Sequence, residues 1–169
     1  LPHAWRAAMS WTRWLVLLPL FEHLARGEGM PAWAAGDHDL RPLLDEQGGL
    51  SRERLRVGGA DVLTAHTDAA AVWLEEWHGR WPSCRPEFLR NLRALECILS
   101  GHLEAFRGAR TEGAWRLRSA LRERLGVLFH RYLLQPAGAF AFIAISALEM
   151  ERLRSELVTR ALFAPRESA

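Results

Sequence analysis

The chain has 169 residues, of which 49% are hydrophobic and 25% are charged. This length fits one domain with a sizeable core. The apolar content and the eight Trp argue against a disordered chain, which needs low hydrophobicity and high net charge. All 22 basic residues are Arg, so chemistry that requires a lysine is excluded. Two Cys are too few for a disulfide framework or a four-cysteine zinc site, and they fit a reducing compartment.

The net charge of +2 conceals a difference between the two halves of the chain. Residues 1–83 carry eight Arg against eleven acidic residues, a net charge of −3, and residues 84–169 carry fourteen Arg against nine, a net charge of +5. A chain polarised in this way favours an oriented protein partner. Nucleic-acid binding needs a concentrated basic stripe, and acidic residues interleave with these arginines, so we expect no nucleic acid as a partner.

The first part of the chain predicts short helices separated by glycines. Apolar residues at three- and four-residue spacing predict a helix that Pro19 kinks or restarts and that Gly27 ends. We expect an N-terminal helical lobe over residues 1–59, in which Ser51 caps the last helix. The predicted segments, in order, are a helix over residues 11–26, a loop over residues 27–39, and short helices over residues 40–47 and 52–57.

The remainder predicts an all-α, up-down bundle of about four long helices over residues 60–169, continuous with the lobe as one domain. The connections between these helices are short, as antiparallel neighbours require, and no segment alternates with a period of two. In the last helix, Ile143, Met150, Leu153 and Leu157 recur at helical spacing and are expected to face the core. The helices are predicted near residues 60–80, 86–107, 112–134 and 138–163. Pro86 starts the second helix and Gly108 ends it, Thr111 caps the third, and the third helix has one apolar face that contains Leu117, Leu121, Leu125 and Leu128.

The most hydrophobic segment runs over residues 132–148, which carry no formal charge. Gln135, Pro136 and Gly138 interrupt it, and 17 residues are short for a membrane helix. We therefore expect a buried helix and no transmembrane helix, although a chain that lies against a membrane complex could use this segment.

A metal site is the one chemical alternative that the spacing of side chains raises. Glu75 and His78 are three residues apart and share a helix face, as ligands do in di-metal carboxylate bundles, and His102 could join them. Such sites need a second Glu-x-x-His pair, which the sequence lacks, and His78 also suits a helix C-terminus. No Walker A motif, Gly-x-Ser-x-Gly elbow or dinucleotide turn is present, so we expect no catalytic residue and no cofactor.

Aromatic and basic side chains are the candidates for partner binding. Trp73, Trp77 and Trp81 form a ladder at four-residue spacing, and Trp81 at its end is the candidate anchor for a partner. Arg118 and Arg122 decorate the third long helix, where they could equally form a solvated face. Trp and Arg are enriched at binding hot spots, which favours an interaction surface.

The last helix reads PAGAFAFIAISALEMERLRSELVTRALF and resembles the C-terminal helix of the V-type ATPase C/d family, whose members cap the rotor ring and bind the central stalk. That family has an aromatic-rich start followed by Glu-Ile-Arg-Asn-aliphatic-Arg. Glu151 and Arg152 depart from it, since they stand where the family has Arg and Asn. The resemblance covers about 25–30 residues of a chain about half the family's size. The positions that match are Glu149, Met150, Leu153, Arg154, Leu157 and Arg160.

The resemblance implies a non-enzymatic protein that sits on the cytoplasmic face of the membrane rotor ring and receives the central stalk. We therefore expect a helical adaptor or assembly protein, cytoplasmic or peripheral on the inner membrane face, with protein partners such as rotor-ring and stalk subunits. Trp81, Arg118, Arg122, Glu149 and Arg154 are the residues expected to bind them. The alternative is a small helical-bundle metal-binding enzyme or sensor that uses Glu75, His78 and His102.

Overall fold

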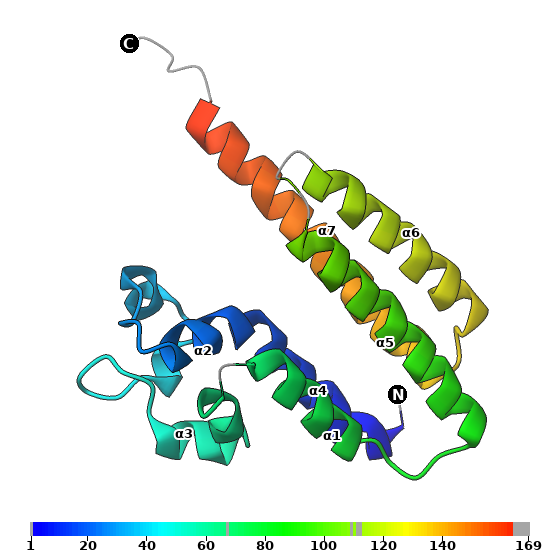
Figure 1. The fold of residues 1–169 in the computed structure, drawn as a ribbon, viewed down its shortest axis with the longest axis horizontal. Coiled ribbons are helices and arrows are strands. Elements are labelled where there is room, and N and C mark those ends of the chain that lie inside the picture. Colours follow the sequence, from blue (N-terminus) through cyan, green and yellow to red (C-terminus); the bar gives the residue numbers. More distant parts are fainter. Residues whose placement is uncertain (1, 67, 109, 111–112, 164–169) are drawn as a thin grey trace. The chain divides into compact units, whose positions relative to one another are not determined.

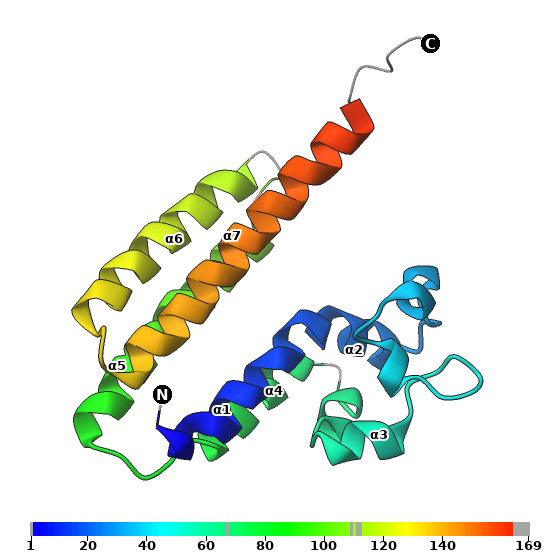
Figure 2. The ribbon, with the colours of Figure 1, turned by 180° about the vertical axis from the view of Figure 1, so that it is seen from behind.

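A computed structural model describes residues 2–66, 68–108, 110 and 113–163, and their backbone is mainly helical (Figures 1 and 2). Within these ranges the structure contains no β-strand, and an isolated bridge between Leu44 and Leu50 is the one β-type pairing found there. The all-α prediction is confirmed for this part of the chain.

The chain divides into two compact units, an N-terminal unit over Pro2–Pro82 and a C-terminal unit that begins at Ser83. The expected division lay after residue 59, so the structure groups the helix predicted near residues 60–80 with the N-terminal elements. The four-helix bundle that would include this helix stays a prediction. Helices α5, α6 and α7 of the C-terminal unit pack against one another.

The N-terminal unit is built from short helical segments. Its α-helices are α1 (Arg6–Trp11), α2 (Leu18–Ala25), α3 (Arg52–Val57) and α4 (Ala69–Gly79). Single 3-10 turns connect or extend them: η1 (His3–Trp5), η2 (Thr12–Leu17), η3 (Ala32–Gly36), η4 (Arg41–Leu43) and η5 (Asp61–Thr64). The helix expected near residues 40–47 is only the turn η4, followed by the bridge between Leu44 and Leu50.

Local sequence signals explain most of these boundaries. Pro19 lies in the first turn of α2, where a missing N–H costs nothing, and Gly27 ends the helix with a φ of +80°. The Ser51 hydroxyl accepts from the backbone N–H of Arg54 and caps α3, as predicted. The helix expected from residue 60 begins later, because the Asp68 carboxylate caps α4 by accepting from the N–H of Ala71 at 3.0 Å.

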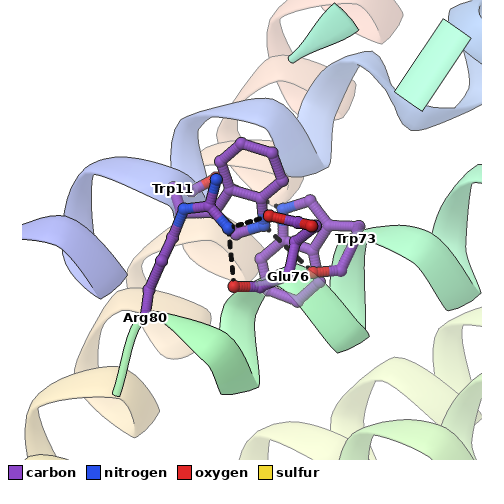
Figure 3. Close-up of polar contacts among 4 residues, drawn as sticks. All are labelled: Trp11, Trp73, Glu76 and Arg80. Carbon is purple, nitrogen blue, oxygen red and sulfur yellow. Dashed lines mark hydrogen bonds and ion pairs between the residues drawn. The ribbon is translucent and has the colours of Figure 1, made fainter. Parts of the chain in front are cut away.

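Tryptophans fill the core of the N-terminal unit. The indole Nε1 of Trp11 donates to the carbonyl of Trp73 at 3.0 Å, and the indole Nε1 of Trp73 donates to the carbonyl of Trp11 at 3.2 Å (Figure 3). The Arg80 guanidinium covers the Trp11 ring at 3.8 Å and is held by the side chain and the carbonyl of Glu76. These contacts join α1 to α4. The buried tryptophans of this unit are Trp5, Trp11, Trp14, Trp73 and Trp77.

The C-terminal unit consists of long helices connected by short turns: α5 (Pro86–Arg107), α6 (Ala114–Arg131) and α7 (Pro136–Phe163). Their bounds agree closely with the prediction, although Thr111, the expected cap of α6, lies outside the described residues. Leucines at helical spacing form the core, together with small residues and Phe140 at the start of α7. The buried apolar residues are Leu92, Leu95, Leu121, Leu125, Leu128, Ala137, Phe140 and Ala141.

The second half of α7 departs from the prediction. Met150, Leu153 and Leu157 were expected in the core, yet they are 67%, 54% and 66% exposed. Near Met150, α6 still lies beside α7, because the flanking Glu149 and Glu151 pair with Arg122 and Arg118, so Met150 is exposed on a face that α6 does not cover. Further along, α7 with its 28 residues extends past the 18-residue α6, as both views show. The stripe has the spacing of a core face but faces solvent.

Candidate protein-docking surface

Two ion pairs join α6 to α7, and they involve three of the residues that the sequence predicted for partner binding. Arg118 donates to both carboxylate oxygens of Glu151, from Nε at 3.0 Å and from Nη2 at 2.5 Å. Arg122 donates from its Nε to the Glu149 carboxylate. Arg118, Arg122 and Glu149 therefore contact residues of their own unit, and this geometry suits a role in holding α6 against α7.

Arg118 also packs against aromatic rings. Its guanidinium carbon lies 4.7 Å from the ring centre of Phe106 on α5 and 5.6 Å from that of Trp115 on α6. An arginine that stacks on rings and forms two hydrogen bonds with one carboxylate is held in a fixed orientation. Arg118 thus connects α5, α6 and α7 at this level of the bundle.

His102 lies beside this junction on α5, with its ring centre 5.8 Å from that of Phe106. Partial burial lowers the pKa of His102, the positive charges of Arg118 and Arg124 lower it further, and the Glu151 carboxylate opposes them. Proton uptake by this imidazole is therefore disfavoured in the folded unit. His102 has the environment of a neutral packing residue at the edge of the core.

A shallow groove of about 360 Å³ follows the seam between α6 and α7. Trp115 lines it and is 50% exposed, although no pattern in the sequence had singled this residue out. The remaining lining is mostly charged, and each of its charged side chains takes part in an ion pair. These residues are Arg118, Ser119, Arg122, Leu148, Glu149, Arg152 and Glu156.

Beyond the groove, the exposed end of α7 combines apolar side chains with arginines. Arg154 and Arg160 are exposed and have no ion-pair partner in the described part of the chain, whereas Arg152 donates to Glu156 at 3.2 Å. Large apolar side chains exposed by about half or more surround them. These are Met150, Leu153, Leu157, Val158, Leu162 and Phe163.

Trp81, the predicted anchor, lies at the end of the aromatic ladder in the N-terminal unit. Its ring is edge-on to Trp77 at 5.0 Å and to His78 at 4.6 Å. The side chain is only partly exposed, and its buried Nε1 has no hydrogen-bond partner among the described residues. A buried indole N–H without an acceptor is unusual, but Trp81 offers less contact area than the end of α7.

The residues of the alternative metal site are spread over both units. Glu75 and His78 are exposed on α4, and His102 lies on α5 in the C-terminal unit. Among the residues that the structure describes, no group of three or more His, Cys, Asp or Glu is arranged to hold a metal ion. The arrangement therefore gives this alternative no support.

The hairpin of α6 and α7 explains a pairing that the sequence reading missed. Arg118 and Glu151 lie at nearly equal distances from the turn after Arg131, so an antiparallel arrangement brings them together. This spacing could have been read from the sequence. Glu151, noted there only as a departure from a family pattern, is the residue that binds Arg118.

No helix within the described ranges is long and apolar enough to cross a membrane. A scan of protein-family models, a search of curated proteins and a search of solved structures find no match to this chain. The resemblance of α7 to the V-type ATPase C/d family is therefore neither supported nor opposed by them, and the surface of the molecule has to carry the functional argument.

Proposed function

We propose that this chain is a non-enzymatic helical adaptor that binds a protein partner through the exposed end of α7. The observation that carries the proposal is the apolar stripe of Met150, Leu153 and Leu157. These residues repeat at intervals of three and four, the spacing by which helices pack against one another. A large exposed apolar patch on a folded unit marks an interaction site.

The form of the surface indicates the chemistry of the partner. A single helix presents a narrow ridge, which an amphipathic helix of the partner can cover by side-by-side packing. Arg154 and Arg160 have no carboxylate partner within the described ranges, so acidic residues on the partner helix would complement them. The expected partner is a helical protein with an apolar stripe flanked by Asp or Glu.

The end of α7 has apolar surface that a partner can cover. Trp115 of α6 lies near Thr159 and Arg160, but Leu157, Leu162 and Phe163 remain largely exposed. Covering Leu157, Leu162 and Phe163 would remove apolar surface from water at roughly 25 cal/mol for each Å². Binding would therefore bury the stripe and stabilise this part of the helix.

The resemblance of α7 to the V-type ATPase family suggests which partners to test first. Met150, Leu153, Arg154 and Leu157 match the family pattern and lie on the exposed end of α7. We therefore propose rotor-ring and central-stalk subunits of a membrane ATPase as partners, with the chain on the cytoplasmic face of the membrane.

Site-specific photo-crosslinking in the native host tests the proposal. A crosslinking amino acid at position 153 should capture a partner, and the same amino acid at position 57 serves as the control, because Val57 is 89% exposed in the other unit. The variant Met150→Ser/Leu153→Ser/Leu157→Ser should abolish capture of the same partner while leaving the helix content unchanged.

The outcomes separate the general proposal from the specific one. Capture of rotor-ring or stalk subunits at position 153 alone supports both. Capture of another identified helical protein, lost in the triple variant, keeps the docking surface and removes the ATPase assignment. A free monomer, or equal capture from positions 153 and 57, would contradict the adaptor proposal.

A further inference from the structure

The turn between α6 and α7 places two leucines in water. Leu133 is 56% exposed and Leu134 is 96% exposed, and they occupy the two central positions of a turn closed by the hydrogen bond from the Gln135 N–H to the Tyr132 carbonyl at 2.9 Å. Central turn positions normally carry Gly, Pro, Asn, Asp or Ser. Two exposed leucines there contribute little to the folding of the turn.

This turn is held rigidly. The buried Asn91 side chain on α5 donates from its Nδ2 to the Gln135 Oε1 at 2.6 Å, which fixes the turn to the neighbouring helix. Gly138 packs so closely that a Cβ there would lie 2.1 Å from the Tyr132 carbonyl oxygen. Leu133 and Leu134 are thus presented by a preorganised turn, and binding would cost little conformational entropy.

The charge around the turn is positive. Since Asn91 contacts Gln135, the first turns of α5 lie at the same end of the C-terminal unit as the turn. Residues 83–96 and 123–142 together contain five Arg and three acidic residues, Glu87, Glu96 and Glu123, a net charge of +2. Arg131 directly precedes the turn, and Arg90 and Arg93 are exposed on α5.

We propose that this end of the C-terminal unit binds the surface of an anionic lipid bilayer. Leu133 and Leu134 would insert at the level of the headgroups, and Arg90, Arg93 and Arg131 would contact lipid phosphates. An apolar tip combined with dispersed basic residues is the chemistry of reversible membrane association, because shallow insertion and electrostatic attraction are both needed.

This inference does not depend on the proposed docking surface. The lipid-binding tip lies at the start of α7, and the docking stripe of Met150, Leu153 and Leu157 begins about half of the way along this helix. One helix would then connect a membrane surface to a protein partner. Each end can be altered by substitutions that leave the other unchanged.

Co-sedimentation with lipid vesicles tests the inference on the full chain. Vesicles that contain phosphatidylglycerol should bind the protein, whereas vesicles of phosphatidylcholine alone should bind it weakly. The variant Leu133→Ser/Leu134→Ser should lower binding by about tenfold or more, because two side chains no longer insert. Arg90→Gln/Arg131→Gln should cause a similar loss on anionic vesicles and a weaker dependence on salt.

Two matched variants make the result decisive. Val57→Ser removes an equally exposed apolar side chain from the N-terminal unit, and Met150→Ser/Leu153→Ser/Leu157→Ser alters the docking stripe. Both should bind vesicles like the unmodified chain, and circular dichroism should show that the tip variants keep their helices. The triple variant separates the proposals, since it should lose the protein partner and keep the lipid.

Several results would overturn the inference. These are the absence of vesicle binding, equal binding to neutral and anionic vesicles, and loss of binding in the docking-stripe variant but not in the tip variants. A protein captured through Leu133 and Leu134, with no vesicle binding, would show that the tip is a protein interface instead.

Discussion

The two units of this chain use their apolar residues in opposite ways. Among the large apolar side chains that the structure describes as exposed, four belong to Pro2–Pro82 and twelve to Ser83–Phe163. The N-terminal unit buries most of its tryptophans, whereas the C-terminal unit forms its core mainly from leucines and exposes the rest. Exposed apolar surface therefore concentrates in the unit with the longer helices.

The lengths of the helices account for this difference. Segments of three to eleven residues cannot stand alone, so the N-terminal elements need large side chains that reach several neighbours at once. Helices of 18 to 28 residues need only one leucine stripe each to pack, which leaves their other faces free. We infer that the N-terminal unit is primarily a folded support and that partners bind the C-terminal unit.

The largest expected effect comes from Trp11→Ala in the N-terminal unit. The substitution removes both hydrogen bonds with Trp73 and the ring under Arg80, and it leaves a cavity, so we expect a loss of about 3–5 kcal/mol in the free energy of unfolding. Urea unfolding followed by Trp fluorescence measures this loss. Seven of the eight Trp precede residue 83, so replacing Trp115 with Phe in the background limits the fluorescence signal to the N-terminal unit.

Trp33→Ala is the control for Trp11→Ala. Trp33 is 58% exposed in the same unit, and its removal should change the free energy of unfolding by about 0.5 kcal/mol or less. A loss below about 1 kcal/mol for Trp11→Ala would show that the aromatic junction between α1 and α4 does not stabilise the unit.

The next effect in size concerns two glycines of the C-terminal unit. Gly138→Ala places a Cβ 2.1 Å from the Tyr132 carbonyl oxygen, which is backbone and cannot move aside, so we expect a loss of about 3 kcal/mol. Gly126→Ala on α6 meets nothing within 4 Å and should stabilise the helix by about 0.5–1 kcal/mol. Thermal unfolding followed by circular dichroism distinguishes them, and equal effects would contradict the close contact at the turn.

The sequence was sufficient for the elements that local signals determine. Proline and glycine positions predicted α5 and the ends of α2, and the leucine spacing of α6 predicted its buried face. The late start of α4 was not predicted. The helix begins after Asp68 because this side chain caps it, and the spacing of apolar residues does not show where a cap lies. The boundary between the two units was predicted after residue 59 but lies after Pro82, because it depends on which helices pack against one another.

The candidate surface was harder to predict for a physical reason. Periodicity shows that Met150, Leu153 and Leu157 share a face of α7, but it does not show which face of α7 its neighbouring helices cover. Arg118 and Arg122 were proposed as contacts for a partner, and their carboxylates proved to lie on α7. The spacing of these arginines along α6 alone does not reveal the pairs, whereas their distances from the turn, compared with those of Glu149 and Glu151, would have indicated them.

A smaller effect is expected from the ion pair between Arg118 and Glu151. Both side chains are partly exposed, at 26% and 44%, so a double-mutant cycle with alanine should give a coupling of about 0.5–1 kcal/mol that weakens at high salt. The pair of Arg80 and Glu76 in the N-terminal unit has similar exposure and provides the comparison. A coupling near zero for Arg118 and Glu151 would mean that the ring contacts alone fix Arg118.

The smallest expected effect is a difference between the two units in how their stability depends on pH. Burial and the charges of Arg118 and Arg124 lower the pKa of His102 below its ordinary 6.5, so the unfolded chain takes up the proton before the folded unit does. The contribution of His102 therefore destabilises the C-terminal unit as the pH falls below 6.5, and this loss ends below the lowered pKa. His102→Gln should reduce the acid sensitivity of the C-terminal unfolding transition, followed by circular dichroism, and leave the fluorescence transition of the N-terminal unit unchanged.

His38→Gln is the control. The His38 side chain is 99% exposed, so its replacement should alter neither transition. An unchanged acid response in His102→Gln would place the pH sensitivity of the bundle elsewhere.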